Sequence, residues 1–122
     1  MKNETNKNEQ SKDVEYYRNM YVYLPEFFFA TSEIGVAAAL MCLGYTLICV
    51  DAEHLEGFIF LFDNSDEEER HHKHEPSTHD LADRYFTDEL DVKAKSFFNH
   101  LKVLNNRMSS NRTQRPYATY AE

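Results

Sequence analysis

The sequence predicts an α+β fold in which a small, mostly antiparallel sheet of three or four strands packs against two or three helices. Two observations lead to this fold class. The stretch from residue 27 to residue 63 has the pattern strand, helix, strand, strand, and a long helical pattern follows at 92–108. Because strands and helices alternate only once, a doubly wound parallel sheet is not expected.

The first predicted strand contains the three consecutive Phe residues at 27–29, since aromatic side chains favour the pleated surface of a sheet. A buried helix is predicted over 32–43, where almost every side chain is apolar. Thr31 or Ser32 is the expected N-cap of this helix. Gly44 is the expected left-handed residue that closes it.

Two apolar strands follow this helix, at 45–50 and 57–62, and the short polar connection between them predicts a hairpin. In the second strand, Phe58, Phe60 and Phe62 share one face, and the two aliphatic residues between them share the other. Both faces of the sheet are therefore apolar, whereas the late helix has a stripe for only one of them. We expect a homodimer in which a second chain covers the remaining apolar surface.

Two further helices are predicted after the hairpin. Ser77 or Thr78 is expected to cap the shorter helix, at 79–90. Asp91 precedes the longer helix, at 92–108. Its apolar stripe follows the spacing i, i+3, i+4, i+7 and comprises Ala94, Phe97, Phe98, Leu101, Leu104 and Met108.

The 122 residues predict a single domain with polar ends. An aromatic edge strand is expected at 20–24, where Pro25 ends it. The chain begins without an apolar secretion signal and contains no transmembrane run, so a cytoplasmic location is expected. The predicted organisation is a disordered tail at 1–15, a domain at 16–108 that includes a charged loop at 64–77, and a flexible basic tail at 109–122.

The formal net charge of −8 hides an uneven distribution along the chain. Residues 1–91 contain 7 basic and 20 acidic residues, a net charge of −13. Residues 92–121 contain 6 basic residues and no acidic one. An acidic body with a basic C-terminal part restricts the partners that the protein is able to bind.

The tyrosine-rich segment and the acidic run are the candidate protein-binding residues. Tyrosine is enriched at the centres of protein interfaces, and carboxylates are able to occupy a basic groove on a partner. The same tyrosines also fit an ordinary sheet surface. The predicted partner-binding residues are Tyr16, Tyr17, Tyr21, Tyr23, Asp66, Glu67, Glu68 and Glu69.

The basic helix and tail suggest nucleic-acid binding as the alternative function, because lysine and arginine contact phosphates. The acidic body opposes this interpretation, since it repels phosphate at long range. A solvated basic face is also what an ordinary surface helix presents. The candidate phosphate-contacting residues are Lys93, Lys95, Lys102, Arg107, Arg112 and Arg115.

No catalytic or metal motif is recognisable in the sequence. His71, His72 and His74 follow the acidic run, but their spacing fits no defined zinc motif. Cys42 and Cys49 fall in apolar segments and are expected to be small buried side chains. The sequence therefore predicts a non-catalytic protein without a metal or cofactor.

The predicted strands and helices follow one another in a characteristic order. The residues that define this order are Thr31, Ser32, Glu33, Ala37–Leu40, Gly44, Phe60, Phe62, Asp91, Phe97, Phe98 and Leu101. Over residues 27–104 the chain resembles a family of small uncharacterised phage and bacterial proteins that is known only as a domain of unknown function. The resemblance implies no activity and no catalytic residues. It implies a phage or mobile-element accessory protein that binds and modulates a host factor or defence complex.

Overall fold

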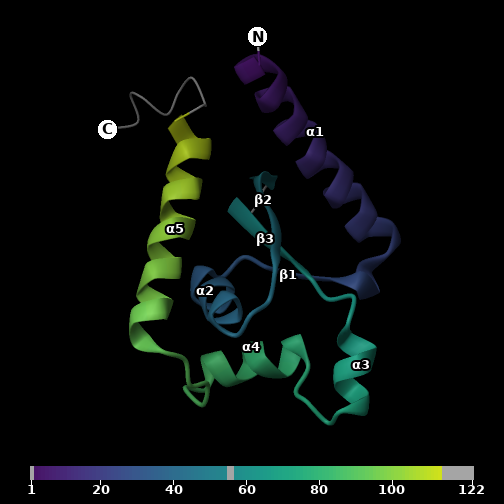
Figure 1. The fold of residues 1–122 in the computed structure, drawn as a ribbon, viewed down its shortest axis with the longest axis vertical. Coiled ribbons are helices and arrows are strands. Elements are labelled where there is room, and N and C mark those ends of the chain that lie inside the picture. Colours follow the sequence, from purple (N-terminus) through teal and green to yellow (C-terminus); the bar gives the residue numbers. More distant parts are fainter. Residues whose placement is uncertain (1, 55–56, 114–122) are drawn as a thin grey trace.

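The computed structural model describes the backbone of residues 2–54 and 57–113, and the side chains of residues 13–52 and 57–110. Within these ranges the chain forms five α-helices, one short 3₁₀ helix and three strands (Figure 1). The elements are α1 (Lys2–Tyr23), η1 (Pro25–Phe27), β1 (Phe28–Thr31), α2 (Ile34–Cys42), β2 (Leu47–His54), β3 (Gly57–Asp63), α3 (Glu67–His72), α4 (Thr78–Phe86) and α5 (Ala94–Thr113).

The three strands form one antiparallel sheet in which β3 lies between β1 and β2. Phe62 is paired with Phe29 in β1 and with Leu47 in β2. The predicted pairing of the two strands after the buried helix is therefore confirmed, and so is the α+β fold class. A register shift between Leu47 and Cys49 marks a bulge in β2, which is an edge strand.

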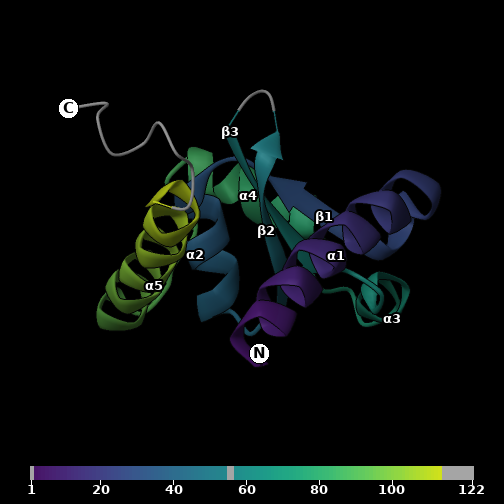
Figure 2. The ribbon, with the colours of Figure 1, turned by 90° about the horizontal axis from the view of Figure 1, so that it is seen from above.

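One face of the sheet carries the main core. Phe60 and Phe62 are fully buried there, as the alternation of apolar residues predicts. Helices α2 and α5 cover this face (Figure 2), with Leu40 and Leu104 completely enclosed between the layers. Helix α4 runs across one end of the sheet and packs on α2 (Figure 1).

The opposite face of the sheet is covered by α1 (Figure 2). Cys49 and Leu61 are buried on this face, where Tyr17 and Met20 of the helix pack against them. The apolar surface that led us to expect a second chain is thus covered within one chain. The homodimer stays a prediction, but this motivation for it is gone.

The predicted disordered tail at 1–15 and edge strand at 20–24 are wrong, because Lys2–Tyr23 is a single helix. The first 24 residues contain neither Gly nor Pro. Val14, Tyr17 and Tyr21 have the spacing i, i+3, i+7 that places apolar side chains on one helical face. The helix ends before Pro25, as expected from the restriction that proline imposes on the residue before it.

Three smaller corrections concern the later elements. The predicted charged loop at 64–77 contains α3, whose first turn is acidic and therefore matches the helix dipole. Helix α5 continues to Thr113, into the predicted tail at 109–122; residues 114–122 lie outside the described residues. Phe98 is exposed and does not belong to the buried stripe of α5.

The ends of the helices follow the local chemistry of the sequence. Gly44 has φ 95° and closes α2, with the Tyr45 N–H donating to the Leu40 carbonyl oxygen. Ser77 and Asp80 form a reciprocal capping box at the start of α4. The N-cap of α2 is Glu33, whose side chain accepts a hydrogen bond from the Gly35 N–H. The prediction of Thr31 or Ser32 as this N-cap is therefore wrong by one or two positions.

Candidate functional site

The C-terminal end of α1 exposes a group of apolar and aromatic side chains. Tyr16 is 58% exposed and Tyr23 is 81% exposed. Their orientation follows from the helix, because Tyr17 and Met20 take the positions that face the sheet. Tyr16 packs edge-on against Tyr17, with ring centroids 5.2 Å apart.

The structure divides the four predicted tyrosines between two environments. Tyr17 is half-buried and belongs to the packing against the sheet. Tyr21 is at the border, since its ring meets Phe28 edge-on at 6.4 Å. Tyr16 and Tyr23 are more exposed than Tyr17 and Tyr21.

The sequence reasoning missed three exposed residues next to these tyrosines: Val22, Leu24 and Phe27. The prediction placed Phe27 inside the first strand. The structure places it in η1, where it is 44% exposed. Pro25 was the available signal, because proline favours the first turn of a helix and η1 begins with it.

The second predicted group of partner-binding residues lies in and just before α3. Glu68 and Glu69 are exposed, and the nearest base to Glu69 is Lys73, with N and O atoms 4.0 Å apart. Asp66 forms an ion pair with Arg70 at 2.9 Å. Glu67 is half-buried, and its Oε1 has no hydrogen-bond partner among the described atoms.

Arg70 connects α3 to the body of the protein. Its guanidinium lies 4.0 Å from the centre of the Tyr45 ring, in a cation–π arrangement. Burial raises the pKa of Tyr45, and the positive charge of Arg70 acts against this increase. The one arginine of α3 is thus engaged with Tyr45 and Asp66, while Glu68 and Glu69 are exposed, with Lys73 beside Glu69.

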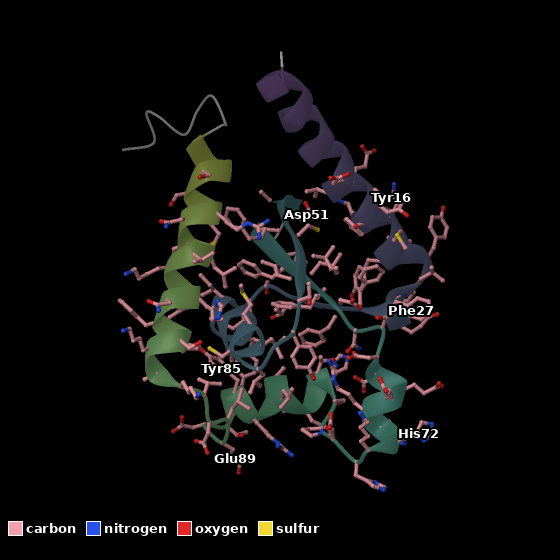
Figure 3. The ribbon with its side chains drawn as sticks, viewed as in Figure 1. Tyr16, Phe27, Asp51, His72, Tyr85 and Glu89 are labelled. Carbon is pink, nitrogen blue, oxygen red and sulfur yellow. The ribbon has the colours of Figure 1, made fainter. Side chains whose placement is uncertain are left out.

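The two groups of predicted residues lie on the same side of the molecule. The backbone N–H of Asn64 donates to the carbonyl oxygen of Phe27 at 2.8 Å, which joins the segment before α3 to η1. Tyr16, Phe27 and His72 lie along one side of the protein (Figure 3). We call the combined region the aromatic–acidic surface: Tyr16, Val22, Tyr23, Leu24, Phe27, Asp66, Glu68 and Glu69.

The candidate phosphate-contacting residues lie on α5 and beside its first turn. Lys93, Lys95, Lys102 and Arg107 are all exposed. The structure does not bring them into one patch, because Arg107 is displaced around the helix from Lys95 and Lys102. The side chains of Arg112 and Arg115 lie outside the described residues.

Neither the histidines nor the cysteines form a catalytic arrangement among the described residues. No group of three His, Cys, Asp or Glu side chains there is placed to hold a metal ion, and His79 packs edge-on against Phe29 instead. Both cysteines are free. Burial, reinforced by Asp51, raises the pKa of Cys49 to about 11, so its thiol stays protonated at neutral pH.

An open hollow lies beside the start of α5. Its lining contains Cys42 but no histidine. The lining residues are Cys42, Leu43, Asp91, Val92, Lys93 and Ser96.

Among the described residues, no helix has both the length and the apolar content needed to cross a membrane. Comparison of the chain with protein-family models, curated proteins and solved structures found no match. The resemblance to a phage and bacterial family therefore stays a prediction from the sequence.

Proposed function

We propose that this protein is a non-catalytic protein-binding module that docks a basic partner through the aromatic–acidic surface. The observation that carries the proposal is the exposure of large apolar side chains on one side of the molecule, next to the exposed carboxylates of Glu68 and Glu69 in α3. Contiguous exposed apolar residues rimmed by polar ones are typical of protein-binding sites on soluble proteins.

The electrostatics of this surface favour a cationic partner. The last turn of α1 contains no basic residue, so the negative end of its dipole is not neutralised by its own side chains. Glu26 in η1 and the carboxylates of α3 add negative charge beside the aromatic rings. An arginine-rich segment suits both components, because guanidinium groups stack on tyrosine and pair with carboxylates.

A basic partner of this kind includes nucleic-acid-binding proteins, whose grooves are shaped for negative charge. An acidic surface with aromatic anchors is able to occupy such a groove by charge complementarity. This role agrees with the expected phage or mobile-element accessory protein in the cytoplasm that modulates a host factor or defence complex.

Nucleic-acid binding by α5 is the second candidate function. It is favoured by Lys95 and Lys102, which lie on either side of the exposed Phe98 ring. Lysines and an aromatic ring together are the components of single-strand binding surfaces. It is opposed by the acidic residues before α5, among them Asp88 and Asp91.

Capture from a nuclease-treated bacterial lysate on the immobilised protein tests the first proposal. Two variants alter the surface without touching the core: Tyr23→Ala/Phe27→Ala and Glu68→Gln/Glu69→Gln. The matched control is Phe86→Ala/Val103→Ala, which removes two exposed apolar side chains from α4 and α5, outside both candidate binding surfaces. We expect the captured protein to decrease at least about tenfold with both surface variants, since hot-spot aromatics contribute most of the affinity of an interface.

The control is expected to capture the same protein at the wild-type level. If captured material disappears on nuclease treatment and is sensitive to Lys95→Gln/Lys102→Gln instead, the proposal is wrong and nucleic-acid binding is supported. Circular dichroism of each variant verifies that the fold is retained.

A further inference from the structure

The outer face of α5 carries an uncovered stripe of two lysines with an aromatic ring between them. Lys95, Phe98 and Lys102 follow the spacing i, i+3, i+7 and are all exposed. Phe98 is 59% exposed, and the Lys102 ammonium lies 5.1 Å from the centre of its ring. We call these three residues the basic stripe.

The core side of α5 explains why the basic stripe stays open. Phe97, Leu101 and Leu104 pack toward α2 and the sheet, and the stripe lies outside this face of the helix. No described element of the chain packs over it, as Figure 2 shows α5 at the outer edge of the layers.

The aromatic–acidic surface has the complementary composition. It combines exposed tyrosine and phenylalanine rings with the carboxylates of Glu68 and Glu69, whereas the basic stripe combines a phenylalanine ring with ammonium groups. Opposite charges, together with aromatic rings on both surfaces, favour contact between them.

We propose that the basic stripe of one copy binds the aromatic–acidic surface of a second copy of this chain. The inference rests on the proposed function in that it uses the same aromatic–acidic surface, with α5 as a basic partner. In Figure 2 the two surfaces lie on opposite sides of the sheet, α5 on one side and α1 with α3 on the other. One chain is unable to join them, so the contact is head-to-tail and each copy keeps one free surface.

The dimensions of the two elements favour this occupant over a nucleic acid. The seven-residue separation of Lys95 and Lys102 corresponds to about 10 Å along a helix, and the six residues of α3 to about 9 Å. A short acidic helix such as α3 therefore fits within the length of the stripe without extending past either lysine. A polyanion that continues beyond it meets Asp91, Glu89 and Asp88, which are exposed just before α5.

Association through exposed charges is weak and depends on salt, because ions screen such pairs over about 10 Å at 0.1 M. Light scattering of the purified protein is the test, at 10–20 mM and at 500 mM NaCl (on the order of a 30 Å and a 4 Å screening length). At low salt we expect the average mass to rise above 14.4 kDa with concentration, and at high salt to return to 14.4 kDa.

Two charge-reversal variants separate this contact from general electrostatics. Lys95→Glu/Lys102→Glu reverses the basic stripe, and Glu68→Lys/Glu69→Lys reverses the acidic part of the other surface. The second variant changes the net charge from −8 to −4, because each of two substitutions adds two units. General repulsion then decreases, so loss of association in this variant is specific to the proposed contact.

Each variant alone is expected to stay at 14.4 kDa, because both of its surfaces then carry charge of the same sign, whereas an equimolar mixture is expected to rise above 14.4 kDa at low salt. In the mixture the intact stripe of one variant meets the intact acidic surface of the other, and the two reversed surfaces are again opposite in charge, so association is recovered. The control Arg84→Glu/Arg107→Glu gives the same net charge as the stripe variant, with both changes outside the stripe, and is expected to associate like the wild type.

Three outcomes overturn the inference: a wild-type mass that never exceeds 14.4 kDa at low salt, association that survives in the stripe variant, or a mixture that stays monomeric. A labelled single-stranded DNA oligonucleotide provides the remaining arm. If the oligonucleotide binds a monomeric wild type and not the stripe variant, the stripe binds nucleic acid and the inference is wrong. None of these outcomes changes the capture of a foreign protein by the aromatic–acidic surface, which the stripe variant leaves intact.

Discussion

Arg18 in α1 and Asp51 in β2 form a two-point ion pair that fixes the N-terminal helix to the sheet. The Nε of Arg18 donates to Oδ2 of Asp51 at 2.7 Å, and its Nη2 donates to Oδ1 at 2.9 Å. The Asp51 side chain is only 10% exposed. The pair acts together with the apolar contacts of Val14, Tyr17 and Met20, which pack α1 against the sheet.

Arg18→Met is expected to lower the free energy of unfolding by about 1–3 kcal/mol, because it removes two charge-assisted hydrogen bonds from a mostly buried carboxylate. Methionine keeps the apolar stem of the side chain, so the change isolates the guanidinium. Urea denaturation followed by circular dichroism measures the difference. The control Arg84→Met, at an exposed position on α4, is expected to change the stability by less than about 0.5 kcal/mol. Equal effects of the two substitutions would show that the ion pair contributes nothing.

Much of the fold is predictable because its signals are local. The hairpin of β2 and β3 follows from two short apolar runs separated by a polar turn, and the end of α2 follows from Gly44. The start of α4 follows from Ser77 and its capping box. In each case the residues that determine the element lie within a few positions of it, so no knowledge of the tertiary structure is needed.

Helix α1 was not predicted because its local and tertiary signals disagree. Tyr16, Tyr17 and Val22 have a strong preference for strands, and the first twelve residues have the composition of a disordered segment. The described end of the helix is held by long-range contacts: the packing of Tyr17 and Met20 on the sheet, and the ion pair between Arg18 and Asp51. A sequence read in order does not reveal that two residues 33 positions apart will meet.

Only part of the candidate site could be predicted, because the rest of it also depends on tertiary contacts. The tyrosines and carboxylates were identified by composition, but the distinction between Tyr16, which is exposed, and Tyr17, which is packed, requires the helical phase of α1. Phe27 was missed because the strand was expected to begin one residue too early. The proximity of η1 and α3 depends on the hydrogen bond between Asn64 and Phe27, which is a feature of the tertiary structure.

Cys49 provides a test of burial on the α1 side of the sheet. Burial, with a smaller contribution from Asp51, raises its pKa from 9.0 to about 11. The unfolded chain therefore loses the thiol proton first as the pH increases. The stabilising contribution is complete below pH 9 and is lost as the pH rises through about 11.

Cys49→Val, which has no titrating group, is expected to lose less stability than the wild type between pH 9 and pH 11. Urea denaturation at pH 7, 9, 10 and 11 gives the comparison, with Cys42→Val as the matched control for removal of a thiol. All other titrating groups are the same in the three proteins, so their contributions to the difference cancel. Parallel pH profiles for wild type and Cys49→Val would contradict the assigned pKa.

The absence of a side chain on Gly35 in α2 lets the Tyr85 ring of α4 pack closely against α2. A methyl group on Gly35 would overlap the hydroxyl end of the Tyr85 ring, and Figure 3 shows Tyr85 directed from α4 toward α2. Gly35→Ala is therefore expected to destabilise the fold by about 1–3 kcal/mol, as overpacking does. This happens although alanine is favoured over glycine within a helix by about 1 kcal/mol.

The sign of this effect is expected to reverse when the ring is absent. In a Tyr85→Ala background, Gly35→Ala has space for its methyl group and is expected to stabilise the protein by up to about 1 kcal/mol through helix propensity alone. A double-mutant cycle by urea denaturation measures the coupling between the two positions. Gly44→Ala is the control, because that residue has φ 95° and open space around it. Its cost comes from the backbone conformation and is expected to be the same in both backgrounds. If Gly35→Ala has the same effect with and without the Tyr85 ring, the contact does not determine how α4 packs on α2.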